Sequence, residues 1–229
     1  MKRISAVLAW LVLGCAPVAS SGHQTGTVAP PVNTAETDVA PDAVADTLLT
    51  ELTKLDSTII VEMRYATSNN FTGAPLPGYL ANRAYLRREA SAALALVQAD
   101  LRSQGLSLKV FDAYRPVRAT LAMVDWTARV HRPDLLTDGY IASRSRHNLG
   151  LAIDLTLADA SSGQELEMGT PFDTFSSAAH TANATGLAAQ NRQRLKGAME
   201  RRGFVNYDQE WWHFSFDVPH PLRFDRVIR

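Results

Sequence analysis

Residues 145–154 read Ser-Arg-His-Asn-Leu-Gly-Leu-Ala-Ile-Asp, a run in which an imidazole precedes an alternating apolar segment that ends on an acid. His147 and Asp154 are seven positions apart, and on one uninterrupted strand that odd separation would point them to opposite faces. They converge only if His147 lies on the loop that enters the strand, or if Gly150 allows a kink or bulge. A carboxylate in so apolar a strand needs a partner, because burying it unpaired is costly. A metal ion or a histidine would meet that need.

A second cluster, Glu210-Trp211-Trp212-His213-Phe214, places an acid and an imidazole three residues apart in a short aromatic segment that we predict to be a strand. The two clusters together supply two imidazoles and two carboxylates. Catalytic zinc commonly takes three nitrogen or oxygen ligands, and a further carboxylate can then act as general base toward water. Residue types alone leave open whether Asp154 or Glu210 is the ligand. The alternative is a salt-bridged pair of buried histidines without a metal.

The segments around these clusters predict an α+β fold, an antiparallel β-sheet with flanking helices. Apolar residues at three-to-four spacing, or a proline that suits a first turn, predict helices over residues 87–103, 117–130 and 187–202. Alternation of apolar and polar residues predicts strands over 106–113, 149–157 and 204–216. Helices and strands do not alternate as a repeating strand-helix unit, which favours an antiparallel sheet.

The N-terminal region differs from the rest of the chain. Residues 1–15 combine Lys2 and Arg3 with an apolar run too short to span a bilayer, which is typical of a signal peptide. The run ends on Cys15 in Val-Leu-Gly-Cys, which resembles the lipobox of bacterial lipoproteins, and predicts lipidation of that cysteine. The alternative is ordinary secretion with cleavage near residues 16–20. Residues 16–46 are rich in Ala, Pro and Thr, acidic and free of Lys and Arg, and predict a flexible linker before a domain at 47–229.

Composition narrows the function classes further. The 229 residues hold 23 Lys and Arg against 23 Asp and Glu, so no basic excess indicates a nucleic-acid partner. A single cysteine excludes an intramolecular disulfide and a cysteine-rich zinc site. The apolar fraction of 46% argues against disorder of the chain as a whole. Composition does not decide the oligomeric state.

The chain resembles a known family in both clusters. Residues 145–154 match the SxHxxGxAxD signature of zinc D,D-peptidases, and residues 210–213 match the ExxH of the subgroup that cleaves free D-alanyl-D-alanine. Over residues 47–229 the chain is similar to D-Ala-D-Ala dipeptidases of the VanX type, in peptidase family M15, which implies the Hedgehog/D,D-peptidase-like zinc fold. Further blocks in the same register are Arg64-Tyr65-Ala66-Thr67, Asn70-Phe71-Thr72-Gly73, Tyr114-Arg115-Pro116, Met168-Gly169, Phe172-Asp173 and Gln190-Asn191-Arg192.

The resemblance implies a role for each matching residue. One zinc ion per chain is expected on three ligands, which are His147, Asp154 and His213. Glu210 is implied as general base and acid, and Arg115 as the group that stabilises the oxyanion, for which a permanently charged guanidinium is suited. We further expect Ser145 and Asp173 to hold the substrate ammonium and Tyr65 to line the pocket.

Two positions depart from the family pattern. Ala113 stands where glycine is common, and Arg146 stands where a small residue is often seen. Arg146 either tunes the pocket toward the substrate carboxylate or faces solvent, and we favour solvent.

The implied activity is hydrolysis of D-Ala-D-Ala, a small D,D-dipeptide, to two D-alanines. Export would place the protein in the periplasm, anchored to a membrane only through its lipid, which favours a role in cell-wall turnover over antibiotic resistance. One alternative is a zinc D,D-carboxypeptidase that trims peptidoglycan stem peptides. Another is a non-catalytic zinc lipoprotein that binds wall fragments, although pure binding would have no use for Glu210.

Overall fold

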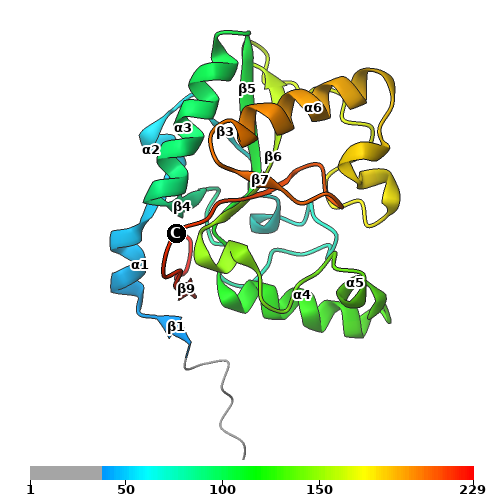
Figure 1. Ribbon diagram of the computed structural model, residues 1–229. Helices are drawn as coiled ribbons and strands as arrows, with labels where there is room; N and C mark the ends of the chain where they lie inside the picture. Colours follow the sequence, from blue (N-terminus) through cyan, green and yellow to red (C-terminus); the bar gives the residue numbers. More distant parts are fainter. Residues whose placement is uncertain (1–37) are drawn as a thin grey trace, which may run out of the picture. The chain divides into compact units, whose positions relative to one another are not determined.

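The computed structural model describes residues 38–229, in which short and long elements surround one central sheet (Figure 1). The predicted signal peptide, Cys15 and the predicted linker as far as residue 37 lie outside the described residues. The strands are β1 Val39–Ala40, β2 Leu49–Glu51, β3 Ile60–Val61, β4 Tyr85–Arg87, β5 Leu106–Asp112, β6 Ala152–Asp159, β7 Val205–Asn206, β8 His213–Ser215 and β9 Arg223–Phe224. The helices are α1 Asp42–Leu48, α2 Leu52–Leu55, α3 Arg88–Arg102, α4 Val117–Arg129, α5 Asp134–Thr137 and α6 Gly186–Glu200, with 3-10 turns η1 Arg64–Ala66, η2 Arg146–Leu149, η3 Ser177–Ala179 and η4 Thr181–Asn183.

The central sheet has the strand order β3-β5-β6-β8-β7. All its neighbours are antiparallel except β3, which runs parallel to β5 at one edge. The chain between β3 and β5 includes α3, and a parallel pair needs such a long crossover. The predicted α+β fold with an antiparallel sheet is therefore confirmed, with one parallel edge strand added.

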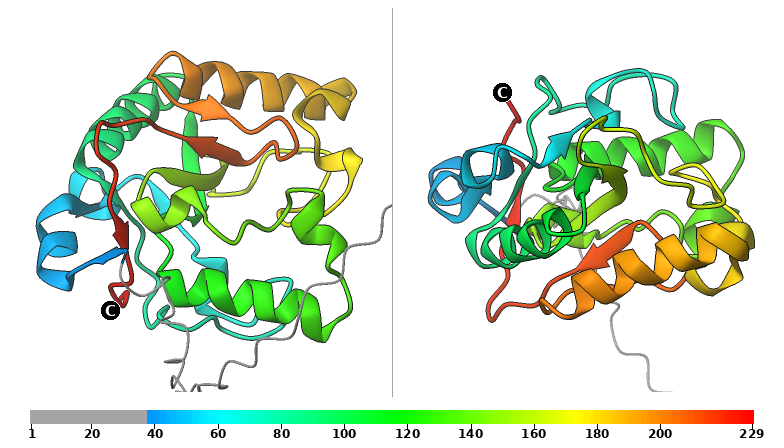
Figure 2. Two further views of the ribbon diagram at one scale, coloured as in Figure 1. Left: turned by 60° about the horizontal axis from the view of Figure 1, so that its bottom comes forward. Right: turned by 90° about the horizontal axis from the view of Figure 1, so that it is seen from above.

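Helices α3 and α6 pack against each other and against this sheet, α3 on β5 and α6 along β7 (Figures 1 and 2). The periodic residues that predicted α3 are its buried side: Ala90, Leu94, Val97 and Leu101 are fully buried. They belong to the same hydrophobic core as the apolar side chains of β6, Ile153, Leu155 and Leu157, which are also fully buried. Helix α4 lies apart from α3 and α6, at the bottom of the view in Figure 1. The predicted helix boundaries match the observed ones to within two residues.

Two predicted strands differ from the structure. The strand expected over 149–157 begins only at Ala152, because residues 146–149 form the turn η2. The segment 204–216 is not one strand but a hairpin, in which Asn206 of β7 pairs with Phe214 of β8. The chain turns back between them through hydrogen bonds from the Glu210 amide to the Tyr207 carbonyl and from the His213 amide to the Glu210 carbonyl. Glu210 therefore lies on the loop that enters β8, and His213 is the first residue of that strand.

Ordered structure begins before residue 47, the predicted start of the domain. Residues 39–46 of the predicted linker form β1 and most of α1. Ala45 is fully buried, and β1 pairs in parallel with β9 near the other end of the chain. Proline at position 41 precedes the first helical residue, where its missing N–H costs nothing. In residues 38–229, none of the helices has the length and apolar character that crossing a bilayer requires.

Candidate active site

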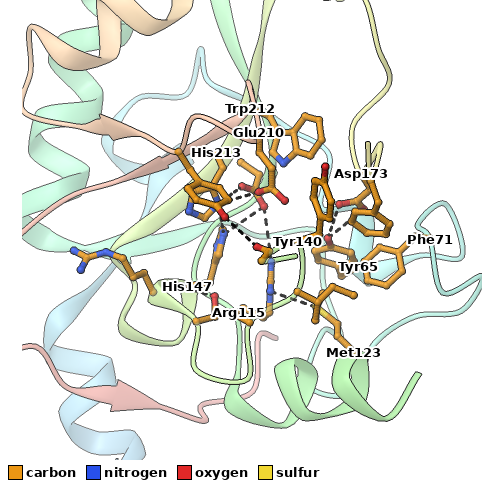
Figure 3. Close-up of a pocket in the computed structure, with 18 of the residues that line it drawn as sticks. Tyr65, Phe71, Arg115, Met123, Tyr140, His147, Asp173, Glu210, Trp212 and His213 are labelled. Carbon is orange, nitrogen blue, oxygen red and sulfur yellow. Dashed lines mark hydrogen bonds and ion pairs between the residues drawn. The ribbon is translucent and has the colours of Figure 1, made fainter. Parts of the chain in front are cut away.

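His147, Asp154 and His213 come together near the first residues of the adjacent strands β6 and β8, and the two histidines are labelled in Figure 3. The Nδ1 atom of His213 lies 2.9 Å from Asp154 Oδ1 and 3.2 Å from His147 Nε2. The His147 Nε2 atom lies 3.3 Å from Asp154 Oδ2. Asp154 and His213 face each other as register partners on β6 and β8, whereas His147 reaches them from the turn η2.

The turn η2 resolves the odd spacing between His147 and Asp154. Ser145 caps the turn, because its hydroxyl accepts a hydrogen bond from the His147 amide at 3.2 Å. Gly150 ends the turn in the left-handed conformation, with φ at +64°. Both routes considered from the sequence are used together: the imidazole lies on the entering loop, and a glycine makes the bend that leads into the strand.

Local contacts prepare both imidazoles as ligands. The Nδ1 atom of His147 lies 2.6 Å from the Ala113 carbonyl oxygen and donates to it, which leaves Nε2 free to face Asp154. Burial lowers the pKa of His213, which keeps its ring neutral. Burial alone would raise the pKa of Asp154, but the neighbouring imidazoles outweigh it and lower that pKa below its usual range. Two imidazoles and one ionised carboxylate suit a divalent transition-metal ion.

Glu210 lies beside this cluster, with its Oε2 atom 3.8 Å from His213 Nδ1. The residue is 7% exposed, and within residues 38–229 no hydrogen bond to its carboxylate is present. Burial first, and then the charges of Asp154 and Asp173, raise its pKa well above the ordinary value. A buried carboxyl group that accepts no hydrogen bond and has a raised pKa is a candidate for proton transfer.

Arg115 forms part of the cavity wall on the other side of Asp154, with its Nη2 atom 3.8 Å from Asp154 Oδ2. Its Cζ atom lies 5.2 Å from the centre of the Tyr65 ring, and its Nη1 lies 3.3 Å from the Met123 sulfur. Asp112 Oδ2 accepts a hydrogen bond from Arg115 Nε at 2.9 Å and forms an ion pair with Nη2 at 2.8 Å. Asp112 was missed in the sequence, where the only signal was an acid at the end of an apolar strand, just before Tyr114-Arg115-Pro116.

Tyr65 and Asp173 meet at one side of the same cavity. The Tyr65 hydroxyl donates to the Asp173 carboxylate, 3.0 and 3.1 Å from its two oxygens. Asp173 adopts φ of +60°, a strained conformation for a residue other than glycine. Its pKa is raised well above the ordinary value by burial and by the charge of Asp154. Ser145 also lines the cavity, but no contact brings it to Asp173, and its hydroxyl already caps η2.

The cavity that these groups share has a volume of about 250 Å³. Every residue for which a metal, catalytic or substrate role was predicted lines it: Tyr65, Arg115, Ser145, His147, Asp154, Asp173, Glu210 and His213. Aromatic side chains, among them Phe71, Tyr140 and Trp212, form much of the remaining wall (Figure 3). Arg146 lies at the rim, where its guanidinium donates to the Phe216 carbonyl at 2.6 Å and pairs with Asp217. That guanidinium is therefore committed to a surface ion pair.

An α+β fold that buries a His-Asp-His cluster beside a free carboxyl group and an arginine defines a metal-dependent hydrolase. The chain belongs to peptidase family M15: a family model described as D-Ala-D-Ala dipeptidase matches residues 46–225. The resemblance seen in the sequence is thereby confirmed, and the chain is a metallopeptidase.

The D-alanyl-D-alanine dipeptidase of Enterococcus faecium is 37% identical to this chain, covering 70% of this chain and 87% of the relative. The D-alanyl-D-alanine dipeptidase of Escherichia coli K12 is 34% identical, covering 79% and 91%. Among solved structures, the vancomycin resistance D,D-dipeptidase VanXYg in complex with a D-Ala-D-Ala phosphinate analogue is 18% identical with a TM-score of 0.37, covering 76% of this chain and 68% of that chain.

Proposed function

We propose that this protein is a zinc-dependent D-alanyl-D-alanine dipeptidase, which hydrolyses D-Ala-D-Ala to two molecules of D-alanine. The observation that carries the proposal is the Glu210 carboxyl group, buried next to the His-Asp-His cluster. The relatives named above, which are dipeptidases of this specificity, support the choice of substrate.

Zinc would be held by His147 Nε2, His213 Nδ1 and the Asp154 carboxylate, the donor atoms that face one another. When bound, zinc supplies a Lewis acid for the scissile carbonyl and lowers the pKa of water to about 7. The hydrogen bond from His147 Nδ1 to the Ala113 carbonyl fixes that ring in the required tautomer.

Glu210 would move the proton. Its raised pKa brings the carboxyl group closer to neutral pH, where an acid–base catalyst is most effective. In the carboxylate form it accepts a proton from the attacking water, and it then donates that proton to the nitrogen of the leaving D-alanine. Both transfers balance, so Glu210 ends the cycle as it began.

Arg115 would stabilise the negative charge that develops on the carbonyl oxygen. The guanidinium carries five N–H donors; Nε donates to Asp112 and Nη1 to the Met123 sulfur, which leaves further N–H groups of this cavity-lining residue available. Buried, pre-oriented donors of this kind contribute more than they would in water, because no solvent must reorganise.

The Tyr65–Asp173 pair would hold the ammonium group of the substrate. Asp173 carries the negative charge, and the Tyr65 hydroxyl fixes its carboxylate. Ser145, on the rim of the same cavity, would add a hydroxyl acceptor. A small cavity with a charged partner for the free amino group favours a dipeptide over the end of a longer chain.

The test is an assay of the zinc-loaded protein with D-Ala-D-Ala and with a stem pentapeptide that ends in D-Ala-D-Ala, measuring released D-alanine. We expect turnover of the dipeptide and at least about a hundredfold lower kcat/KM for the pentapeptide, equivalent to about 2.7 kcal/mol. Preference for the pentapeptide would establish the D,D-carboxypeptidase alternative. Glu210→Ala should abolish turnover while zinc content stays at one per chain, and retained activity would overturn the assigned mechanism.

Cys15 would be lipidated and the protein held in the periplasm by that anchor, with the linker separating membrane and domain. A single acyl chain binds membranes weakly, so stable attachment needs the several chains that a lipobox cysteine receives. The proposed role is recycling of D-Ala-D-Ala released from the cell wall. Labelling with radioactive palmitate should mark the wild-type protein and not Cys15→Ala, and labelling of both would contradict lipidation at that cysteine.

A further inference from the structure

The proposed reaction leaves one buried acid of the site, Asp112, without a role. Its side chain is fully buried at the end of β5. The Oδ2 atom accepts the hydrogen bond from Arg115 Nε and pairs with Nη2, and the Oδ1 atom accepts from the Tyr79 hydroxyl at 2.5 Å. The Nδ1 atom of His147 also lies 3.4 Å from Oδ2. One carboxylate thus contacts both the predicted oxyanion group and a predicted metal ligand.

An irregularity in the sheet directs Asp112 to this place. Val110 of β5 pairs with Leu155 of β6, but the next pair is Asp112 with Asp154, so Phe111 is an extra residue in β5. In a regular ladder Phe111 would pair with Asp154. Asp112 would then lie on the same face of β5 as Leu106 and Leu108, which points into the core. The bulge instead aligns Asp112, Asp154 and His213 in one row across three neighbouring strands.

The contacts of Arg115 show what that carboxylate can control. Asp112 holds one edge of the guanidinium with a charge-assisted hydrogen bond to Nε, a strong class of hydrogen bond, and with an ion pair to Nη2. The next acceptor available to the same Nη2 atom is Asp154, 3.8 Å away. Without Asp112, Arg115 would turn toward Asp154 and compete for a carboxylate that the metal requires.

We infer that Asp112 is a positioning residue, which holds the Arg115 guanidinium toward the developing oxyanion and away from Asp154. The inference rests on the proposed hydrolysis for its kinetic effect, but the hold on Arg115 is a property of the folded chain itself.

The kinetic test is Asp112→Asn in the zinc-loaded protein, which keeps the shape and removes the charge. Loss of one oxyanion donor costs about a hundred- to a thousandfold in kcat. A displaced arginine loses part of that, so we expect kcat to fall about ten- to a hundredfold, with KM changed less than about threefold. Affinity for a phosphinate dipeptide analogue, which mimics the tetrahedral state, should fall in parallel with kcat.

Tyr79→Phe is the matched control, because it removes the other hydrogen bond to the same carboxylate and leaves the Arg115 contact intact. It should lower thermal stability and leave kcat within about threefold. In the double variant Asp112→Asn/Arg115→Lys, kcat should be no lower than in Arg115→Lys alone. Equal losses of kcat in Asp112→Asn and Tyr79→Phe, or additive losses in the double variant, would overturn the positioning role.

A second measurement needs neither activity nor a folded Asp112 variant. In nitrogen-15 NMR spectra of the wild-type protein, the Arg115 Nε–H signal, assigned by its loss in Arg115→Lys, should exchange slowly with water. Rapid exchange would refute the inference even if the dipeptide is hydrolysed. Absence of D-Ala-D-Ala hydrolysis together with slow exchange would refute only the proposed function.

Discussion

Replacing Gly150 by alanine should destabilise the protein more than the same change at any open glycine, because Gly150 joins the turn that carries His147 to the strand that carries Asp154. Its φ of +64° lies in the left-handed region. A Cβ atom added there would lie 2.6 Å from Leu49 Cδ2 and 3.1 Å from the backbone nitrogen of Arg87. That nitrogen donates to the Gly150 carbonyl at 2.8 Å, so it cannot move away without breaking the bond.

The expected loss has two parts. The left-handed conformation costs an alanine about 1–2 kcal/mol. Overpacking against β2 and β4 adds about 1–3 kcal/mol, so the total is about 2–5 kcal/mol. Gly105 offers a matched control, because its φ is +72° but nothing lies within 4 Å of an added Cβ. Gly105→Ala should therefore lose only the first part, about 1–2 kcal/mol.

Urea unfolding of both variants in the metal-free state measures the two losses directly. Zinc titration of the same proteins should show weaker binding for Gly150→Ala alone, because displacement of η2 moves His147 relative to Asp154. Equal free energies of unfolding for the two variants would show that the close approach at Gly150 is not a constraint. Unchanged zinc affinity would show that η2 does not set the position of the ligand.

Three further outcomes are expected. Glu210→Gln should stabilise the metal-free protein at pH 8 and not at pH 4. The raised pKa of Glu210 means that ionising this group costs the folded state stability above the ordinary pKa of 4.5, and that this cost is absent below it. Urea denaturation of both proteins at the two pH values measures the difference. Arg192→Leu should lower the free energy of unfolding by about 2–4 kcal/mol and raise KM. The buried guanidinium donates to the carbonyls of Met168, Ala178 and His180, which lie on both sides of Asp173 in the sequence. Calorimetry and steady-state kinetics measure the two effects, and an unchanged KM would contradict the prediction. Asp38→Ala, which removes an exposed ion pair with Arg144, should change stability by less than about 1 kcal/mol in urea unfolding, and a larger loss would show that β1 depends on that pair.

Local patterns predicted the long helices because each carries its own signal. In α3 the apolar spacing identifies the buried side, and Gly105 follows at φ +72°, a conformation that stops a helix. In α4 a proline precedes the first turn. The parallel pairing of β3 with β5 had no such signal, because it depends on contacts between distant parts of the chain. The hairpin of β7 and β8 was read as one strand, because alternation continues across a turn that lacks glycine and proline.

Those residues of the site whose side-chain chemistry sets their role could be predicted from the sequence. Residues whose role depends on the local geometry of the backbone could not. Histidines and carboxylates at unusual spacing indicated the cluster, and the family signature assigned their roles. Asp112 was not predicted, because its importance comes from the extra residue Phe111 in β5, and a bulge leaves no mark in the pattern of residue types. The ion pair between Arg146 and Asp217 was not predicted either, because the two residues are 71 positions apart in the sequence.

The charges of the site explain why such a cluster of acids can be buried at all. Asp112, Asp154, Asp173 and Glu210 interact with one another, and Arg115 is the cation that offsets them in the described chain. Burial is the largest cause that raises the pKa of Asp112, Asp173 and Glu210, and the positive charge of Arg115 works in the opposite direction on each of them. A divalent cation on the His-Asp-His cluster and an ammonium group at Asp173, as proposed above, would add further positive charge. We expect the binding of each to favour the binding of the other, since both would relieve the same excess of negative charge.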